Sequence, residues 1–154
     1  MRIEQKNLIR EFRGLCRQVG FKVTTPRLVI YRYLKDNKEH PGVDRVWEAV
    51  RKDLPTISRE SVYRILNDFA SQGIISILDR ADVVARYDAN TKRHDHFYCE
   101  KCGRFFDFEI KELPMLVDAK VRSLGKIERA EVRVRGICNE CLAKEKNVKM
   151  KTIH

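Results

Sequence analysis

Apolar residues recur three or four positions apart through the first half of the chain, a spacing that predicts amphipathic helices. Local signals mark where these segments begin and end. Gly20 ends the first, Thr25-Pro26 opens the second as an N-cap followed by proline, and His40-Pro41-Gly42 precedes the third. The apolar faces of the three expected helices are, in order, Leu8, Phe12, Leu15, Cys16 and Val19; Leu28, Ile30, Tyr31 and Leu34; and Val43, Val46, Trp47 and Val50.

A fourth helix is expected after Ser58, because serine is a favoured N-cap and Ile57 and Val62 are spaced to form a hydrophobic staple. Gly73 ends this helix. Its apolar stripe is Val62, Ile65, Leu66 and Phe69, and its outward residues are Glu60, Arg64, Asn67 and Ser71, with Tyr63 on the flank. Two β-rich runs, IISIL and VVARY, follow and are separated by Asp79-Arg80-Ala81-Asp82, which predicts a hairpin. Three helices followed by a hairpin is the order of a winged helix.

The pattern changes after Asp88. Short strands are expected around HFYC and FFDFEI, a helix over about residues 112–124, and a half-buried strand in AEVRVRGIC, where Val132 and Val134 alternate with charged residues. The polar segment RYDANTKR joins the two parts. We therefore expect an α+β chain with a winged helix-turn-helix domain over residues 1–88 and a small α/β domain over residues 89–154.

Composition and charge narrow the class of protein. The chain of 154 residues contains no apolar run near the roughly 18 residues of a membrane span, and its start is charged rather than apolar, so we expect a cytoplasmic protein with reduced thiols. The net charge of +10 favours a polyanionic partner, although a generally basic surface is the alternative. The excess is shared equally, 17 Lys and Arg against 12 Asp and Glu up to residue 88 and 15 against 10 beyond it, so it does not locate a binding domain.

Two CxxC pairs, Cys99-x-x-Cys102 and Cys138-x-x-Cys141, are separated by 35 residues. Each pair can present both thiolates to one tetrahedral zinc, which predicts a structural zinc site closed by four cysteines. Such a site would stabilise a domain too small to be held by burial alone. A redox pair or a disulfide is the alternative, and the reducing cytoplasm disfavours a disulfide. Cys16 lies on the apolar face of the first helix and is expected to be a buried core thiol.

A second candidate metal site centres on His94-x-His96, whose side chains project from one face of an extended segment. Asp88 and Asp107 lie nearby in the sequence, and His40 could add a third imidazole. Imidazole and carboxylate ligands suit iron(II), manganese(II) or zinc, and they bind less tightly than four thiolates hold zinc. The site could therefore exchange its metal and act as a sensor. The fourth histidine of the chain, His154 at the terminus, is expected to have no role.

The outward face of the fourth helix is a candidate DNA reader. Arg64 can form a bidentate hydrogen bond with guanine or phosphate, and Tyr63 can pack on a thymine methyl group or a sugar. Asn67 can reach adenine or the DNA backbone. Ser61 in its first turn belongs to the same candidate set. The alternative is an ordinary solvated helix face. Candidate phosphate contacts outside this helix are Lys22, Arg27, Arg80 and Arg86.

These stretches together resemble the ferric uptake regulator (Fur) family. The matching segments are GFKVTTPRLVIYRYL, HPGVDRVWEAV, ISRESVYRILNDFASQGII, RYDANTKRHDHFYCEKCGRFFDF and GICNEC, which span residues 20–141. The resemblance implies a homodimer that binds palindromic, A/T-rich operator DNA when its regulatory metal is loaded and thereby represses transcription. It also implies that the second domain senses metal and dimerises, that Lys22 enters the minor groove, and that Tyr63 and Arg64 enter the major groove.

Within the family, the pattern most resembles the peroxide-stress regulators. The resemblance implies a regulatory iron(II) or manganese(II) site made by His40, Asp88, His94, His96 and Asp107, and a peroxide signal read through iron-catalysed oxidation of the ligand histidines. Iron-sensing members usually have Glu in place of Asp107 and often His in place of Ile137. Glu60 departs from the expectation of a DNA-facing helix, since it would repel phosphate. The alternatives are an iron- or manganese-responsive repressor that does not sense peroxide, a zinc enzyme, and a thiol-disulfide oxidoreductase.

Overall fold

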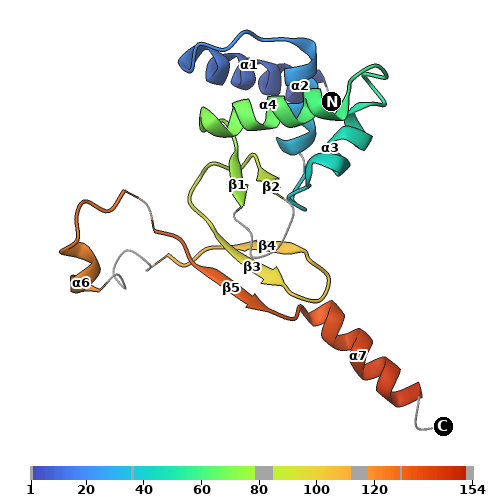
Figure 1. The fold of residues 1–154 in the computed structure, drawn as a ribbon, viewed down its shortest axis with the longest axis vertical. Coiled ribbons are helices and arrows are strands. Elements are labelled where there is room, and N and C mark those ends of the chain that lie inside the picture. Colours follow the sequence, from blue (N-terminus) through green and yellow to red (C-terminus); the bar gives the residue numbers. More distant parts are fainter. Residues whose placement is uncertain (1, 36, 79–84, 112–117, 129, 152–154) are drawn as a thin grey trace. The chain divides into compact units, whose positions relative to one another are not determined.

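The computed structural model describes residues 2–35, 37–78, 85–111, 118–128 and 130–151 (Figure 1). The chain divides into two compact units, residues 1–91 and residues 92–154. The first unit is mainly helical, and the second is built on a small mixed sheet, so the α+β prediction is confirmed. Among the described residues, none of the helices combines the length and the apolar character needed to cross a membrane.

The four helices predicted for the first unit are confirmed. They are α1 (Arg2–Gln18), α2 (Thr25–Lys35), α3 (Val43–Val50) and α4 (Arg59–Ser71). Helix α2 begins at Thr25 itself, one residue earlier than predicted, and the amide of Leu28 bonds the carbonyl of Thr24 at 3.0 Å. Gly20 and Gly73 follow α1 and α4 with φ of 72° and 68°, the left-handed conformation in which glycine commonly ends a helix.

Three aromatic rings from three helices form the centre of the first unit. The Phe12 ring of α1 stacks on Tyr31 of α2 with centroids 4.8 Å apart, and Phe69 of α4 meets Phe12 edge-on at 5.8 Å. Cys16 is fully buried beside them, as predicted. Because these rings meet in favourable stacked and edge-on geometries, they fix α4 against α1 and α2.

The N-terminal end of α4 is fixed by two contacts. Ser58 is its N-cap, as predicted, and its hydroxyl accepts the amide of Ser61 at 3.1 Å. The indole of Trp47 in α3 donates to the carbonyl of Ile57 at 3.0 Å, which holds the segment just before α4. The exposed face of α4 therefore has a defined orientation within the first unit.

The predicted hairpin is also present. Strands β1 (Ser76–Leu78) and β2 (Arg86–Asp88) pair antiparallel, with Ile77 opposite Tyr87. Strand β1 is shorter than the run IISIL, because Ile74 and Ile75 instead pack into the helical core. The first two residues of the run VVARY lie outside the described residues. The predicted turn, with Arg80 in it, lies outside the described residues.

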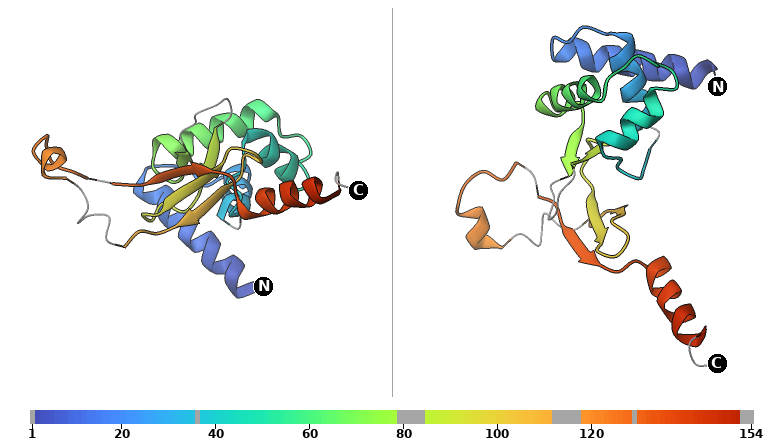
Figure 2. Two further views of the ribbon diagram at one scale, coloured as in Figure 1. Left: turned by 90° about the horizontal axis from the view of Figure 1, so that it is seen from below. Right: turned by 45° about the vertical axis from the view of Figure 1, so that its right-hand side comes forward.

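The second unit has a three-stranded sheet in the order β4-β3-β5 (Figure 2). Strand β3 (Asp95–Cys99) pairs antiparallel with β4 (Phe105–Phe108) and parallel with β5 (Arg133–Gly136). Its helices are α6 (Ala119–Arg122) and α7 (Asn139–Lys151).

Two predictions for this unit need correction. Within the described part of the segment predicted to be helical, residues 118–124, only α6 is helical, and residues 112–117 lie outside the described residues. The prediction of a half-buried β5 is wrong for a single chain, since Val134 is 39% exposed and both arginines beside it are also exposed. Helix α7 was not predicted, because its residues show no apolar stripe.

Candidate metal centres and nucleic-acid interface

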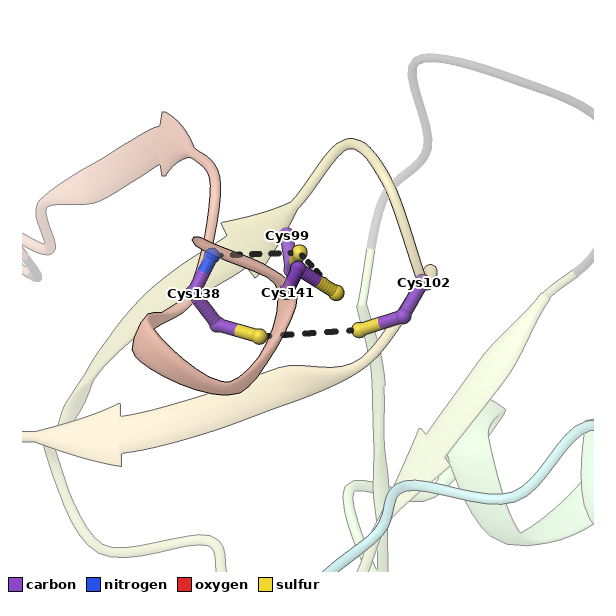
Figure 3. Close-up of side chains that lie close together, drawn as sticks. All are labelled: Cys99, Cys102, Cys138 and Cys141. Carbon is purple, nitrogen blue, oxygen red and sulfur yellow. Dashed lines mark hydrogen bonds between the residues drawn. The ribbon is translucent and has the colours of Figure 1, made fainter. Parts of the chain in front are cut away.

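The four cysteines of the CxxC pairs converge in the second unit (Figure 3). Cys99 ends β3, Cys102 lies in the turn before β4, Cys138 precedes α7, and Cys141 lies in the first turn of α7. The sulfurs of Cys102 and Cys138 are 3.9 Å apart, those of Cys99 and Cys141 are 4.0 Å apart, and all four lie within 4.8 Å of one another. Tetrahedral zinc with bonds of about 2.3 Å separates its sulfurs by roughly 3.8 Å, so this cluster fits zinc.

The backbone brings the two pairs together. Parallel pairing places Cys99 of β3 opposite Gly136 of β5, so the residues that follow each strand form adjacent turns. Gly103 makes the first turn tight, with φ of 67° and a hydrogen bond of 2.8 Å from its amide to the carbonyl of Cys99. The amide of Cys138 then donates to the Cys99 sulfur at 3.3 Å, which joins the second turn to the first.

The thiols differ in how readily they ionise. Burial disfavours the Cys99 thiolate, but hydrogen bonds from the amides of Cys138 and Cys102 outweigh it and lower the pKa of Cys99 to about 6. The Arg104 guanidinium, whose Nε lies 3.5 Å from the Cys102 sulfur, lowers the pKa of Cys102. Burial raises the pKa of Cys141 to about 12. Thiolate is the form that binds metal, so Cys99 and Cys102 are the more readily available ligands.

Ion pairs around this cluster were not found from the sequence. Arg104 bonds Glu140, and Lys101 bonds Glu145, so the turn that carries Cys102 is tied to α7 at two points. The partners are 36 and 44 residues apart in the chain, which is why no local pattern indicated them. Groups that contact the ligands in this way orient a metal site and tune its charge.

A nitrogen and oxygen cluster lies in the same unit. The β3–β4 register places His96 opposite Asp107, with 3.5 Å between Nε2 and Oδ1. His94 lies two positions before His96, and its Nε2 is 3.8 Å from the same carboxylate oxygen. Its Nδ1 lies 2.7 Å from the carbonyl of Lys92, which favours a proton on Nδ1 and leaves Nε2 as the ligand atom. Three of the five residues predicted for the regulatory site therefore converge.

The aspartate between the two histidines has a different role. Asp95 is fully buried and accepts the amides of Ile110 and Val132, each at 2.8 Å. Arg93 reaches the same carboxylate at 3.4 Å and also donates to the carbonyls of Ala130 and Ile110. Burial alone would raise the pKa of Asp95, but the two amides and Arg93 hold it below its usual value. Sequence reasoning missed this pair, which fixes the strand that carries the histidines.

The other two predicted ligands lie together in the first unit. His40 Nδ1 is 3.7 Å from Asp88 Oδ1, and both side chains are buried. The amide of Tyr87 in β2 donates to the carbonyl of Pro41 at 3.2 Å, which brings the His40 loop beside the end of the hairpin. His40 has a φ of 47°, an uncommon conformation for a residue other than glycine, and such conformations concentrate at functional sites.

The candidate nucleic-acid face of α4 is open. Tyr63 is 43% exposed, Arg64 and Glu60 are exposed, and Asn67 is half-buried. A groove of about 570 Å³ runs beside it, lined by Ser61, Arg64, Asn67 and Asp68 of α4, by Pro26 of α2, and by Leu54, Thr56 and Ile57. The hydroxyl of Ser61 lies 2.8 Å from that of Ser58, so it takes part in the cap.

The candidate phosphate contacts lie in different settings. Lys22 is exposed in the segment between α1 and α2, and Arg86 is half-buried in β2. Arg27 donates to the carbonyl of Lys22 and pairs with Asp68.

Comparison with known proteins gives consistent matches. The model of the ferric uptake regulator family matches residues 18–135. The peroxide-responsive repressor PerR of Staphylococcus aureus is 33% identical over 126 residues, which cover 81% of this chain and 85% of the repressor. The ferric uptake regulator of Francisella tularensis, solved with iron, is 30% identical with a TM-score of 0.69, covering 79% of this chain and 95% of that one. The Helicobacter pylori regulator Fur, 24% identical, shares the fold with a TM-score of 0.75 over 90% of this chain and 93% of its own.

Proposed function

The chain belongs to the ferric uptake regulator family of metal-responsive repressors, and from this premise we propose that it represses transcription and is released from DNA by peroxide. The observation that carries the proposal is the convergence of His94, His96 and Asp107 beside a separate four-thiol cluster. The thiol cluster suits a permanent metal, and the nitrogen and oxygen cluster suits an exchangeable one. One small unit thus contains both a structural and a sensing set of ligands.

We assign the structural zinc to Cys99, Cys102, Cys138 and Cys141. A metal held by four thiolates has no open position for substrate, so its contribution is to folding. Here it would link the end of β3 to the start of α7, two segments whose cysteines are 42 residues apart at their furthest. Arg104 and Lys101 lie beside the cluster, and their positive charges would partly offset the negative charge of four thiolates.

We assign the regulatory metal to His40, Asp88, His94, His96 and Asp107. The first unit presents the first two, and the second unit presents the other three. An ion that takes ligands from both sets would favour one arrangement of the two units over others, by its difference in affinity for those arrangements. Under this proposal, loading the metal selects the arrangement that binds operator DNA.

Iron(II) is the metal that we assign for sensing. Held by these five residues, it would supply the reduction of peroxide beside the ligand imidazoles. The chain holds His94 in place through Lys92 and holds His40 through the contact of Pro41 with Tyr87. Transfer of one oxygen atom from peroxide to a ring carbon of either histidine, with water as the other product, would remove a ligand and release the metal. Manganese(II) does not readily reduce peroxide, so the manganese form should repress without responding to it.

DNA binding is assigned to the first unit of a homodimer in the cytoplasm. Tyr63, Arg64 and Asn67 of α4 would read the major groove of a palindromic, A/T-rich operator, with Lys22 in the minor groove. For the dimer contact we propose the second unit, which exposes several large apolar side chains. They are Val121, Leu124, Ile127, Val134, Ile137 and Leu142.

The test is an anaerobic gel shift with the promoter of the protein's own gene and protein loaded with iron(II), manganese(II) or zinc. We expect stoichiometric peroxide to abolish DNA binding by the iron form alone, with one oxygen atom added to a peptide that contains His40 or His94. The manganese form is the matched control. Unmodified histidines with intact DNA binding would instead support the second candidate, an iron- or manganese-responsive repressor, which the iron-bound Francisella relative favours.

A further inference from the structure

Arg27 makes contacts on three sides within the first unit. Its Nη1 donates to the carbonyl of Lys22 at 3.0 Å, and its Nη2 lies 3.2 Å from Asp68 Oδ2. Its guanidinium carbon lies 4.4 Å from the centre of the Phe21 ring. The side chain is only 21% exposed. A guanidinium with partners on one face and two edges links the segments that carry those partners, and it is not a free cation. We call this link, from Lys22 and Phe21 through Arg27 to Asp68, the tie.

One end of this tie is the segment that carries Lys22. The amide of Phe21 bonds the carbonyl of Cys16 at 2.8 Å, and the amide of Leu28 bonds Thr24 at 3.0 Å. Between these two anchors, Arg27 holds the carbonyl of Lys22 and the ring of Phe21. The position of the Lys22 backbone therefore depends on where the Arg27 guanidinium lies.

The other end of the tie is α4. Asp68 lies four residues after Arg64, on the same face of the helix, and lines the same groove as Arg64 and Asn67. Arg27 thus joins the segment that carries Lys22 directly to the candidate reading face. It spans 41 residues of sequence to do so.

We propose that Arg27 and Asp68 are a positioning pair, which sets the distance between Lys22 and the reading face of α4 and does not itself contact phosphate. This inference rests on the proposed DNA-binding function. A protein that contacts two grooves at once has to present both sets of side chains in a fixed relation, and the pair provides that relation before DNA arrives. Order that exists before binding lowers the entropic cost of binding.

The two roles for Arg27 predict opposite effects of changing Asp68. If Arg27 is a phosphate contact, Asp68 competes with DNA and repels phosphate, so Asp68→Ala should tighten operator binding. If the pair positions Lys22, Asp68→Ala should weaken binding even though it removes a negative charge from the DNA-facing side. Residues in contact couple by roughly 2- to 150-fold, and we expect a change in affinity of roughly five- to tenfold for this half-exposed pair.

The experiment measures operator affinity of the metal-loaded, full-length protein over a series of salt concentrations. We expect Arg27→Ala and Asp68→Ala each to weaken binding roughly five- to tenfold, and the double variant to bind no more weakly than the worse single one. Arg27→Lys keeps the charge but cannot bond the Lys22 carbonyl and the Asp68 carboxylate at once as the guanidinium does, so it should resemble Arg27→Ala. Loss of one phosphate contact lowers the magnitude of the slope of log affinity against log salt by roughly 0.9. In these variants the slope should fall by less than that, because Lys22 keeps its charge and only its position is loosened.

Three controls separate the outcomes. Glu60→Ala removes a negative charge from the same helix face without touching the pair, and it should bind DNA as well as the parent or more tightly. Hydrogen exchange at residues 20–24 should be faster in Arg27→Ala and Asp68→Ala, with zinc content and unfolding temperature showing that each variant is folded. Arg64→Ala should weaken binding, and parental affinity in that variant would refute the proposed reading face. If Arg64→Ala weakens binding while Asp68→Ala tightens it, the positioning pair alone is overturned.

Discussion

Asp95→Asn is the sharpest test of how the histidine-bearing strand is held. In the parent, one carboxylate oxygen accepts the amide of Val132 at 2.8 Å and the other accepts that of Ile110 at 2.8 Å, with Arg93 at 3.4 Å. An asparagine has one acceptor oxygen, so its NH₂ group must face one of the two amides. A buried amide that loses its acceptor costs about 1–3 kcal/mol. The weakened ion pair with Arg93 adds to this, so we expect a loss of about 2–4 kcal/mol in the free energy of unfolding.

The measurement is denaturant unfolding of the zinc-loaded protein, with manganese(II) affinity as a second readout. Both should fall, because Asp95 lies between the two histidines and fixes their strand. Asp118→Asn is the matched control, since that exposed carboxylate caps α6 by accepting the amide of Lys120 at 2.7 Å and asparagine caps equally well. If the free energy of unfolding of Asp95→Asn lies within about 0.5 kcal/mol of that of the parent, the carboxylate does not hold the strand.

Three further predictions test other parts of the chain. Cys99→Ser or Cys138→Ser should lose both the tightly bound zinc, about one per chain, and the dimer, and a variant that keeps zinc stoichiometrically as a folded dimer would contradict the assignment. Ser58→Ala should destabilise the protein by about 1 kcal/mol through loss of the α4 cap, and an unchanged unfolding midpoint would show that the cap does not matter. The hydrogen bond from Arg59 lowers the pKa of Asp44, so this carboxylate stabilises the fold above its unfolded pKa and the effect is lost as pH falls through its folded pKa. An NMR titration should give a midpoint below about 3.9, which returns to that value in Arg59→Ala.

The sequence was most informative where one local rule decides the structure. Apolar spacing located the four helices of the first unit, and the serine before α4 caps it as the sequence indicated. The two CxxC pairs predicted a four-thiol cluster, because a metal knuckle is a local motif and two of them are needed to close a tetrahedron. In each of these cases the decisive residues lie within a few positions of one another.

The sequence failed where distant residues decide. Helix α7 has no apolar stripe, and its first two turns are instead placed by Cys141 and by ion pairs to the turn that carries Cys102. The alternation around Val134 was correct for a strand, but Val134 is exposed, and the described residues of one chain do not bury it. Arg93 and Asp95 could not be recognised because their partners are 15 to 37 residues away.

The tripeptide His94-Asp95-His96 shows how one short motif serves two purposes. Because neighbouring side chains of a strand project to opposite faces, the histidines lie on the face of Asp107 while Asp95 lies among the amides of Ile110 and Val132. The anchoring and the ligating groups therefore do not compete for the same space. When the ligands of a site are already in place, little of the metal's binding free energy is spent on ordering them. Under the proposed function, that free energy remains available to favour one arrangement of the two units. To shift the populations of two arrangements from 1:99 to 99:1, the metal must bind the favoured arrangement about 5.5 kcal/mol more tightly than the other. The site can supply this difference only if much of its binding free energy depends on having ligands from both units.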